Sequence, residues 1–202
     1  TRVSVERDVM KAVFISDAHL KKQTDERYLR LLRFISGVKE GRIRSFVDSE
    51  DLPDEKTAID DLYIVGDFFD FWFSEPHRIY PDFQVMISEL IDLQKTGVRI
   101  HFFEGNHDFF LKDYFHDVLG MDVIEEWAVI EPDERRILVS HGDTSDPSDR
   151  LFLLFRKMLR SRAFYRIQSL LPVSWRWSIA AASSNLSKEI NGDKHEILFE
   201  KM

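Results

Sequence analysis

The sequence contains no cysteine among its 202 residues. This absence excludes disulfide bonds and metal sites built from thiolates. The sequence also has no apolar stretch long enough to cross a bilayer as a helix. With 44% hydrophobic and 32% charged residues, the composition is that of a globular protein. A chain of this length can build one sizeable core and a small appended unit.

Basic residues are in deficit overall, whereas acidic residues are missing from one segment. The formal net charge of −8 argues against a general nucleic-acid-binding protein, because such proteins present a basic surface. From Arg150 to Ala182, however, there are seven Arg or Lys residues and no Asp or Glu. This segment is also rich in apolar and aromatic side chains. We therefore expect a basic, apolar segment on an otherwise acidic protein.

Strand-like and helix-like segments alternate along the chain. The pattern predicts strands at 10–16, 62–66 and 98–103, a hairpin from 127–131 and 135–140, and helices at 25–38, from Pro81 to Gly97, and from Asp149 onward with a break at Pro172. The polar run 48–61 is interpreted as a solvated loop rather than a metal site. Alternating strands and helices predict a largely parallel sheet covered by helices, an α/β fold.

The segment "DLYIVGDFFDFWF" at 61–73 places carboxylates in an apolar run. Asp67 and Asp70 are surrounded by aromatic residues, and no Lys or Arg lies between Lys56 and Arg78. Carboxylates in apolar surroundings need a positive partner. That partner must come from elsewhere in the fold, or it is a metal ion.

Polar side chains of the kinds that bind metals follow four of the predicted strands. They are Asp17 and His19, then Asp67, then Asn106, His107 and Asp108, and finally His141. In open α/β sheets the carboxyl ends of the strands form the ligand-binding edge. Each motif alone also fits an ordinary helix cap or turn, but the four in order indicate one shared site.

The donor set of oxygens and imidazoles suits Mn²⁺, Fe²⁺, Zn²⁺ or Mg²⁺. A carboxylate shared by two ions gives the arrangement of two-metal phosphoesterases. Asp67 is the natural shared ligand, because it is the lone ligand in the middle of the order. Water activated by both ions would be the nucleophile.

The motifs "SDAHL", "GDFFD", "GNHD" and "SHGD" resemble the successive motifs of the calcineurin-like metallophosphoesterases. The resemblance implies an αββα sandwich with a core over 1–146. It also implies that Asp17, His19 and Asp67 hold one metal, and that Asp67, Asn106 and His141 hold the other. His107 resembles the histidine that meets the scissile phosphate and protonates the leaving group, a role that suits an imidazole near neutral pH.

Within that superfamily, "SHGDTSDPSDR", Trp72 and "SSNLSKEINGDK" resemble the UDP-2,3-diacylglucosamine pyrophosphatases of lipid A synthesis. This implies a helical lid over 147–202, with Asp149 at its base. Substrate contacts would come from Asn106, Asp149, Ser187, Asn191 and Lys194, and the substrate would be a nucleotide-sugar lipid. The location implied is cytoplasmic, peripheral on the inner membrane of a Gram-negative bacterium.

The basic, apolar segment allows two interpretations. Arg and Lys interleaved with Trp favour contact with an anionic membrane surface. Alternatively, the segment is a helical hairpin packed on the sheet, with the stems of its Arg side chains lying along apolar surface.

Two features depart from the family patterns. His107 stands where the lipid A enzymes have Arg, and the family's later Gly-His-x-His stretch is absent. We therefore expect the chain to be incomplete beyond Met202. The sequence predicts a dinuclear, Mn²⁺-type hydrolase that splits UDP-2,3-diacylglucosamine into UMP and 2,3-diacylglucosamine 1-phosphate. The alternatives are a phosphoesterase acting on a soluble diester or monoester, and a metal-free scaffold with the same fold.

Overall fold

The computed structural model describes residues 10–42, 58–72, 79–131 and 135–170. The expected site residues Ser187, Asn191 and Lys194 lie outside this part of the chain. Within it, no helix is long and apolar enough to cross a membrane.

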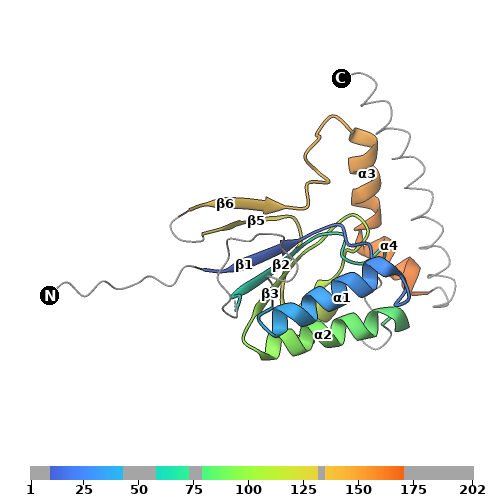
Figure 1. Cartoon of the computed structure of the whole chain (residues 1–202). Coiled ribbons are helices and arrows are strands. Elements are labelled where there is room, and N and C mark those ends of the chain that lie inside the picture. Colours follow the sequence, from blue (N-terminus) through green and yellow to red (C-terminus); the bar gives the residue numbers. More distant parts are fainter. Residues whose placement is uncertain (1–9, 43–57, 73–78, 132–134, 171–202) are drawn as a thin grey trace, which may run out of the picture.

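A four-stranded parallel sheet forms the centre of the protein (Figure 1). Its order is β1 (Ala12–Ile15), β2 (Asp61–Val65), β3 (Arg99–Phe103) and β4 (Asp122–Ile124). Val13 pairs with Leu62, and Leu62 pairs with Ile100. Because all four strands run the same way, their carboxyl ends lie along one edge, as the alternating pattern predicted.

Two helices cover one face of this sheet. Figure 1 shows α1 (Glu26–Lys39) and α2 (Gln84–Lys95) side by side below the strands. Tyr28 and Ile35 of α1 and Met86 and Leu90 of α2 are at most 1% exposed, because each helix repeats its apolar residues at three- and four-residue spacing. The main core therefore lies between the helices and the sheet.

A two-stranded antiparallel sheet covers the other face. It consists of β5 (Trp127–Ile130) and β6 (Ile137–Ser140) and lies above the parallel strands in Figure 1. A smaller core of Tyr63, Phe103 and Val139 fills the space between the two sheets. In the described residues the layers are therefore helix, sheet and sheet, which are three of the four layers of the predicted αββα sandwich.

The remaining elements are short or follow β6. A 3₁₀ turn (η2, Pro81–Phe83) precedes α2, and a π-helical turn (η3, Lys112–His116) precedes β4. Helices α3 (Arg150–Leu159) and α4 (Arg162–Ser169) form the described part of the expected lid. The helical prediction after Asp149 is confirmed for these residues.

The predicted hairpin at 127–131 and 135–140 is confirmed, and its second arm, β6, leads into His141. The strand β4 and the π turn were not predicted, because β4 has only three residues and offers no readable period. The assignment of Asp61 to a solvated loop was wrong. This residue begins β2, is 1% exposed, and pairs with Arg99 and His101 of the neighbouring strand.

Candidate metal centre

The loops after β1 and β2 are wound in an unusual backbone conformation. Asp17, His19 and Asp67 have φ values of 52°, 46° and 51°. These lie in the left-handed region, which residues other than Gly rarely adopt. The N–H of Asp17 donates to the Gly66 carbonyl at 3.1 Å, and that of His19 donates to the Asp67 carbonyl at 2.8 Å. Such conformations cost about 1–3 kcal/mol each and gather at functional sites.

Two glycines allow these loops to approach one another. A Cβ on Gly66 would run into the ring of His141, and Gly66 also has a φ of 76°. A Cβ on Gly105 would run into the side chain and backbone nitrogen of Asp67. The motifs "GD" and "GN" therefore need their glycines for close packing around Asp67.

The Asp67 carboxylate lies at the centre of the site. Its Oδ2 is 3.7 Å from Nε2 of His19 and 3.6 Å from Nε2 of His141. Nε2 of His141 is also 3.1 Å from Oδ1 of Asn106. Residues from four separate loops thus converge on a carboxylate that is 3% exposed.

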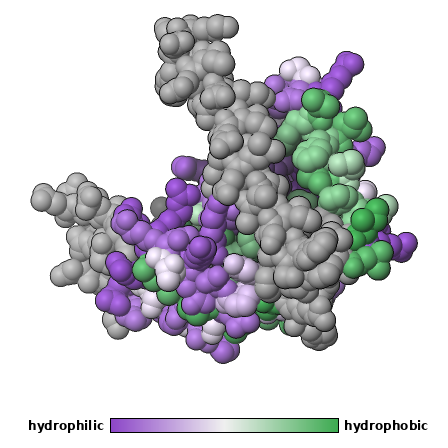
Figure 2. Space-filling view, turned by 90° about the vertical axis from the view of Figure 1, so that its right-hand side faces the viewer, coloured by the Kyte–Doolittle hydropathy of each residue, from purple (hydrophilic) through white to green (hydrophobic). Residues whose placement is uncertain are grey.

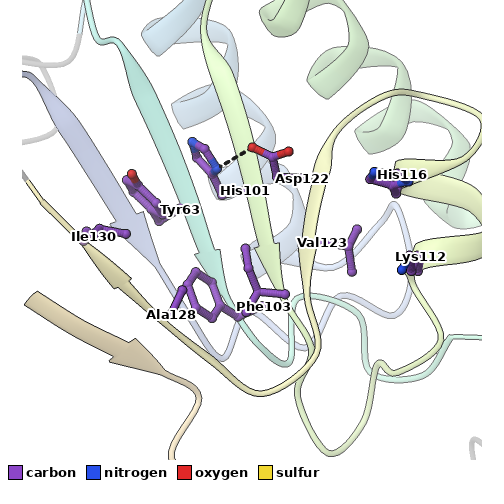
Figure 3. A pocket seen from close by; sticks show the side chains of 10 residues that line it. Tyr63, His101, Phe103, Lys112, His116, Asp122, Val123, Ala128 and Ile130 are labelled. Atoms are coloured by element: carbon purple, nitrogen blue, oxygen red, sulfur yellow. Dashed lines mark ion pairs between the residues drawn. The ribbon is translucent and has the colours of Figure 1, made fainter.

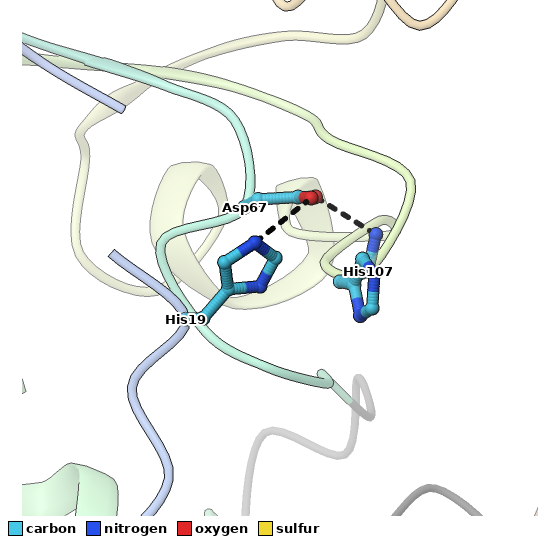
Figure 4. A group of neighbouring side chains, drawn as sticks. All are labelled: His19, Asp67 and His107. Atoms are coloured by element: carbon cyan, nitrogen blue, oxygen red, sulfur yellow. Dashed lines mark hydrogen bonds and ion pairs between the residues drawn. The ribbon is translucent and has the colours of Figure 1, made fainter. Parts of the chain in front are cut away.

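Two sets of possible ligand atoms share Asp67. Within the described residues, His19, Asp67 and His107 form one set and Asp17, Asp67 and His141 form the other, each with ligand atoms within 4.8 Å of one another. The family resemblance instead grouped Asp17 with His19. In the structure His107 joins His19, and their rings meet edge to face at 4.8 Å (Figure 4).

His107 is held by both its backbone and its ring. Its N–H donates to Oδ1 of Asp67 at 2.9 Å, and its Nδ1 lies 3.1 Å from the Asp70 carbonyl oxygen. With Nδ1 occupied by that carbonyl, the other ring nitrogen is the one available for proton transfer or metal binding.

Asp70, a carboxylate within the aromatic run 61–73, has positively charged or imidazole partners from another loop. Its carboxylate lies 3.7 Å from Nδ1 of His19 and 3.2 Å from Nζ of Lys21. The positive partner therefore comes from the loop after β1, as one of the two expectations stated.

Asp108 was not assigned a role from the sequence, yet it joins the loops after β2 and β3. Its Oδ1 accepts the N–H groups of Asp67 at 2.9 Å and Gly105 at 3.1 Å. Its Oδ2 accepts those of Phe68 at 2.7 Å and Phe69 at 3.0 Å. Burial and the nearby Asp67 carboxylate raise the pKa of Asp108, while the backbone N–H groups act in the opposite direction.

The base of the expected lid is anchored beside this centre. Asp149 caps α3 by accepting the N–H of Phe152 at 3.0 Å. Arg156 of α3 pairs with Asp143 at 2.6 Å and with Glu126 at 3.0 Å. Arg156 therefore binds the protein core, so the interpretation of this segment as membrane-facing is wrong for that side chain.

Glu104 and Arg160 form a second anchor. Nη1 of Arg160 donates to Oε2 of Glu104 at 3.2 Å, and the N–H of Leu111 donates to Oε1 at 2.9 Å. Burial raises the pKa of Glu104 to about 7, although the Arg160 guanidinium and the Leu111 N–H act to lower it. Like Arg156, Arg160 faces the core rather than a membrane.

A groove of about 530 Å³ lies between β1 and β6, and its lining includes Asp17 and His141. A separate hollow of about 350 Å³ lies beside β3 and β4 (Figure 3). None of the site residues lines that hollow. In it, His101 lies 3.0 Å from Asp122 and 2.7 Å from Asp61, so both nitrogens of its ring have an acidic partner.

The sequence was compared with models of known protein families, and the family model of the calcineurin-like phosphoesterases matches residues 10–180. The chain therefore belongs to the calcineurin-like phosphoesterase family, and the predictions of family and fold class are confirmed. Among curated relatives, it is similar to the UDP-2,3-diacylglucosamine hydrolase of Hamiltonella defensa subsp. Acyrthosiphon pisum, with 33% identity over 93% of this chain and 66% of that protein.

Two further relatives bear the same name. The chain is 30% identical to the protein of Neisseria meningitidis serogroup A over 88% of this chain and 67% of that one. It is 30% identical to the Proteus mirabilis protein over 95% of this chain and 72% of that one. The chain thus spans about two thirds of the length of the first relatives it matches.

Proposed function

We propose that this protein hydrolyses UDP-2,3-diacylglucosamine to UMP and 2,3-diacylglucosamine 1-phosphate. The convergence of His19, His141 and Asn106 around Asp67 carries the proposal. In the reaction, water adds to the α-phosphorus and the bond to the β-phosphate oxygen breaks. Relatives that match most of the chain bear the name of this hydrolase, which supports this choice of substrate.

The donor set fits two divalent ions, for which we propose Mn²⁺. The imidazole-to-carboxylate spacings of 3.6 and 3.7 Å are too long for hydrogen bonds. They suit ligand atoms that lie around a common ion at about 2.0–2.2 Å each. We propose Asp17, His19, Asp67, Asn106 and His141 as ligands, with Asp67 shared. When bound, the ions supply an activated water and neutralise charge on the phosphoryl oxygens.

Other contacts of the site orient the proposed ligands, and His107 is the group proposed to transfer a proton. Asp67 keeps its orientation because the N–H of His107 donates to its Oδ1 at 2.9 Å. We propose that His107 protonates the leaving phosphate from the ring nitrogen that does not face the Asp70 carbonyl. The Asp70 carboxylate lies 3.7 Å from Nδ1 of His19, which is an electrostatic contact rather than a hydrogen bond.

The apolar face of α3 supports a lipid substrate. Leu151, Leu154, Phe155 and Met158 are between 49% and 80% exposed. Figure 2 shows apolar surface in the upper part of the molecule, at the height where Figure 1 places α3. We propose that this face receives acyl chains at the cytoplasmic surface of a Gram-negative inner membrane, where Asp149, Ser187, Asn191 and Lys194 contact the sugar phosphate.

The test is a turnover assay with the protein expressed from its complete natural gene. With Mn²⁺ and UDP-2,3-diacylglucosamine in mixed micelles, we expect release of UMP, measured by anion-exchange chromatography. Asp67→Ala should lower turnover by more than about a hundredfold, which is the upper end of what outer-shell substitutions cost. Asp92→Ala, at an exposed position of α2, is the matched control and should retain turnover.

Other outcomes would favour the alternatives. Unchanged UMP release by Asp67→Ala would refute the dinuclear site. Hydrolysis of bis-nitrophenyl phosphate without any hydrolysis of the lipid would favour a soluble substrate. Elemental analysis that finds no stoichiometric metal, together with no turnover, would favour a scaffold.

A further inference from the structure

Arg160, at the C-terminal end of α3, contacts the loop after β3 and the residue that follows β4. Its Nη2 donates to the Gly105 carbonyl at 2.7 Å. Its Nη1 donates to Oε2 of Glu104 at 3.2 Å and to the Glu125 carbonyl at 3.1 Å. The guanidinium also lies over the ring of Phe109, 5.6 Å from its centroid. The side chain is 13% exposed; its two Nη atoms make these hydrogen bonds, whereas its Nε is buried without a hydrogen-bond partner in the described part of the chain.

These contacts hold the loop that carries Asn106 and His107. The Gly105 carbonyl belongs to the peptide group that leads into Asn106, and Arg160 fixes it from outside. The Gly105 N–H is fixed from inside by Asp108 at 3.1 Å. Glu104 connects the two ends of the loop, because it binds Arg160 through one oxygen and the Leu111 N–H through the other.

A guanidinium is suited to this position. It presents several donors in one rigid plane, so it can bind a carboxylate and two carbonyl groups at once. A lysine ammonium keeps the charge opposite Glu104 but cannot reproduce the planar set of donors. The contacts of Arg160 are therefore specific in geometry as well as in charge.

Arg156, one turn earlier on α3, binds the other metal-bearing loop. It pairs at 2.6 Å with Asp143, which lies two residues after His141. One face of α3 thus holds both the Asn106 loop and the His141 loop. Oδ1 of Asn106 and Nε2 of His141 lie 3.1 Å apart. The position of α3 and the spacing of these two proposed ligands are linked through two arginines.

We propose that Arg160 is a positioning residue for the metal centre, which orients Asn106 and His107 through the Gly105 carbonyl and Glu104. The proposal depends on the function proposed above, because it assumes that Asn106 binds a metal ion. It assigns to the lid helix a role in assembling the centre in addition to any contact with substrate.

The test measures Mn²⁺ binding by isothermal titration calorimetry and, separately, kcat and KM. Removal of an outer-shell partner typically lowers metal affinity or activity about 10–100-fold. We expect Arg160→Met to weaken Mn²⁺ binding at one site at least about tenfold and to lower kcat by a similar factor. KM should change by less than about threefold, because Arg160 contacts the loop and not the substrate.

Arg160→Lys provides a second variant that keeps the charge beside Glu104. It should bind Mn²⁺ more tightly than Arg160→Met and less tightly than the unmodified protein. Arg30→Met is the matched control, because Arg30 is 76% exposed and pairs with Glu26 at the surface of α1. It should leave Mn²⁺ affinity and kcat unchanged.

The proposal is overturned if folded Arg160 variants bind Mn²⁺ and turn over substrate within twofold of the unmodified protein, even if they unfold at a lower temperature. It is also overturned if Arg160→Lys is indistinguishable from the unmodified protein. Failure of the proposed function looks different, because the unmodified protein itself would then neither bind Mn²⁺ nor release UMP.

Discussion

Replacing Asp108 by asparagine isolates the group that joins the loops after β2 and β3. The two side chains have nearly the same shape, but the amide exchanges one acceptor oxygen for an NH₂ group. Each Asp108 oxygen accepts two backbone N–H groups, at distances between 2.7 and 3.1 Å. Whichever way the Asn side chain turns, two buried N–H donors therefore face a donor.

The structure allows the size of this effect to be worked out. A buried donor without a partner costs about 1–3 kcal/mol, so two such donors lower the free energy of unfolding by about 2–6 kcal/mol. This is a large part of the roughly 5–15 kcal/mol that a domain possesses. Urea denaturation followed by circular dichroism measures the change, with Asp92→Asn as an exposed control. The control should differ from the unmodified protein by about 0.5 kcal/mol or less.

The same variant should also weaken Mn²⁺ binding, because the N–H of Asp67 is one of the four donors and Asp67 is the proposed shared ligand. If the free energy of unfolding of Asp108→Asn lies within about 1 kcal/mol of that of the unmodified protein, the reasoning is refuted. It would mean that Asp108 is held in its neutral form. A neutral carboxyl already has one donor-bearing oxygen, and asparagine would mimic it well.

Further predictions concern a close contact, a buried carboxyl and a helix start. Gly105→Ala should abolish Mn²⁺ binding because its Cβ collides with Asp67, whereas Asp92→Ala, at the surface of α2, should leave the affinity unchanged in the same titration. The folded-state pKa of Glu104 of about 7 lies above its ordinary value of 4.5, so the folded protein binds more protons than the unfolded chain between these values. The free energy of unfolding should therefore decrease by about 3 kcal/mol as pH rises through this window. Glu104→Gln should lack that component in urea titrations at pH 5, 6 and 7, and parallel pH profiles of the two proteins would contradict the assignment. Tyr28→Phe removes the hydroxyl that accepts the Met86 N–H at 3.0 Å and should lower the free energy of unfolding by about 1–3 kcal/mol; an unchanged thermal midpoint would show that the bond contributes nothing.

The parallel core and its ligand-bearing edge could be predicted because both follow from local patterns. Short apolar runs that alternate with amphipathic helices define a parallel sheet, and a parallel sheet brings the ends of its strands together. Asp17 and Asp67 therefore had to lie near one another. The glycines and the left-handed turns then bring the side chains to within a few ångströms, and no sequence period reports that last step.

The outer contacts of the site could not be predicted, because they join residues far apart in the chain. Arg160 meets Gly105 across 55 positions and Arg156 meets Asp143 across 13. An amphipathic pattern also shows that a helix has an apolar and a polar face, but it does not show which of the two faces the core. For α3 the usual assumption, that the apolar face lies inward, gives the wrong orientation for both arginines. Asp108 did offer a local signal, because it is a carboxylate in the motif "GNHD", in which Asn106 and His107 had already been given roles.

The orientation of α3 has a consequence for anyone who engineers this protein. Standard practice replaces exposed leucines and phenylalanines by charged residues to improve yield, and treats arginines on helices as freely exchangeable. Here the second habit would do harm, because Arg156 and Arg160 fasten the helix to the core, and the first would remove the exposed apolar face that we propose receives acyl chains. Formulation with mild detergent is therefore a better way to keep the protein in solution than redesign of this helix.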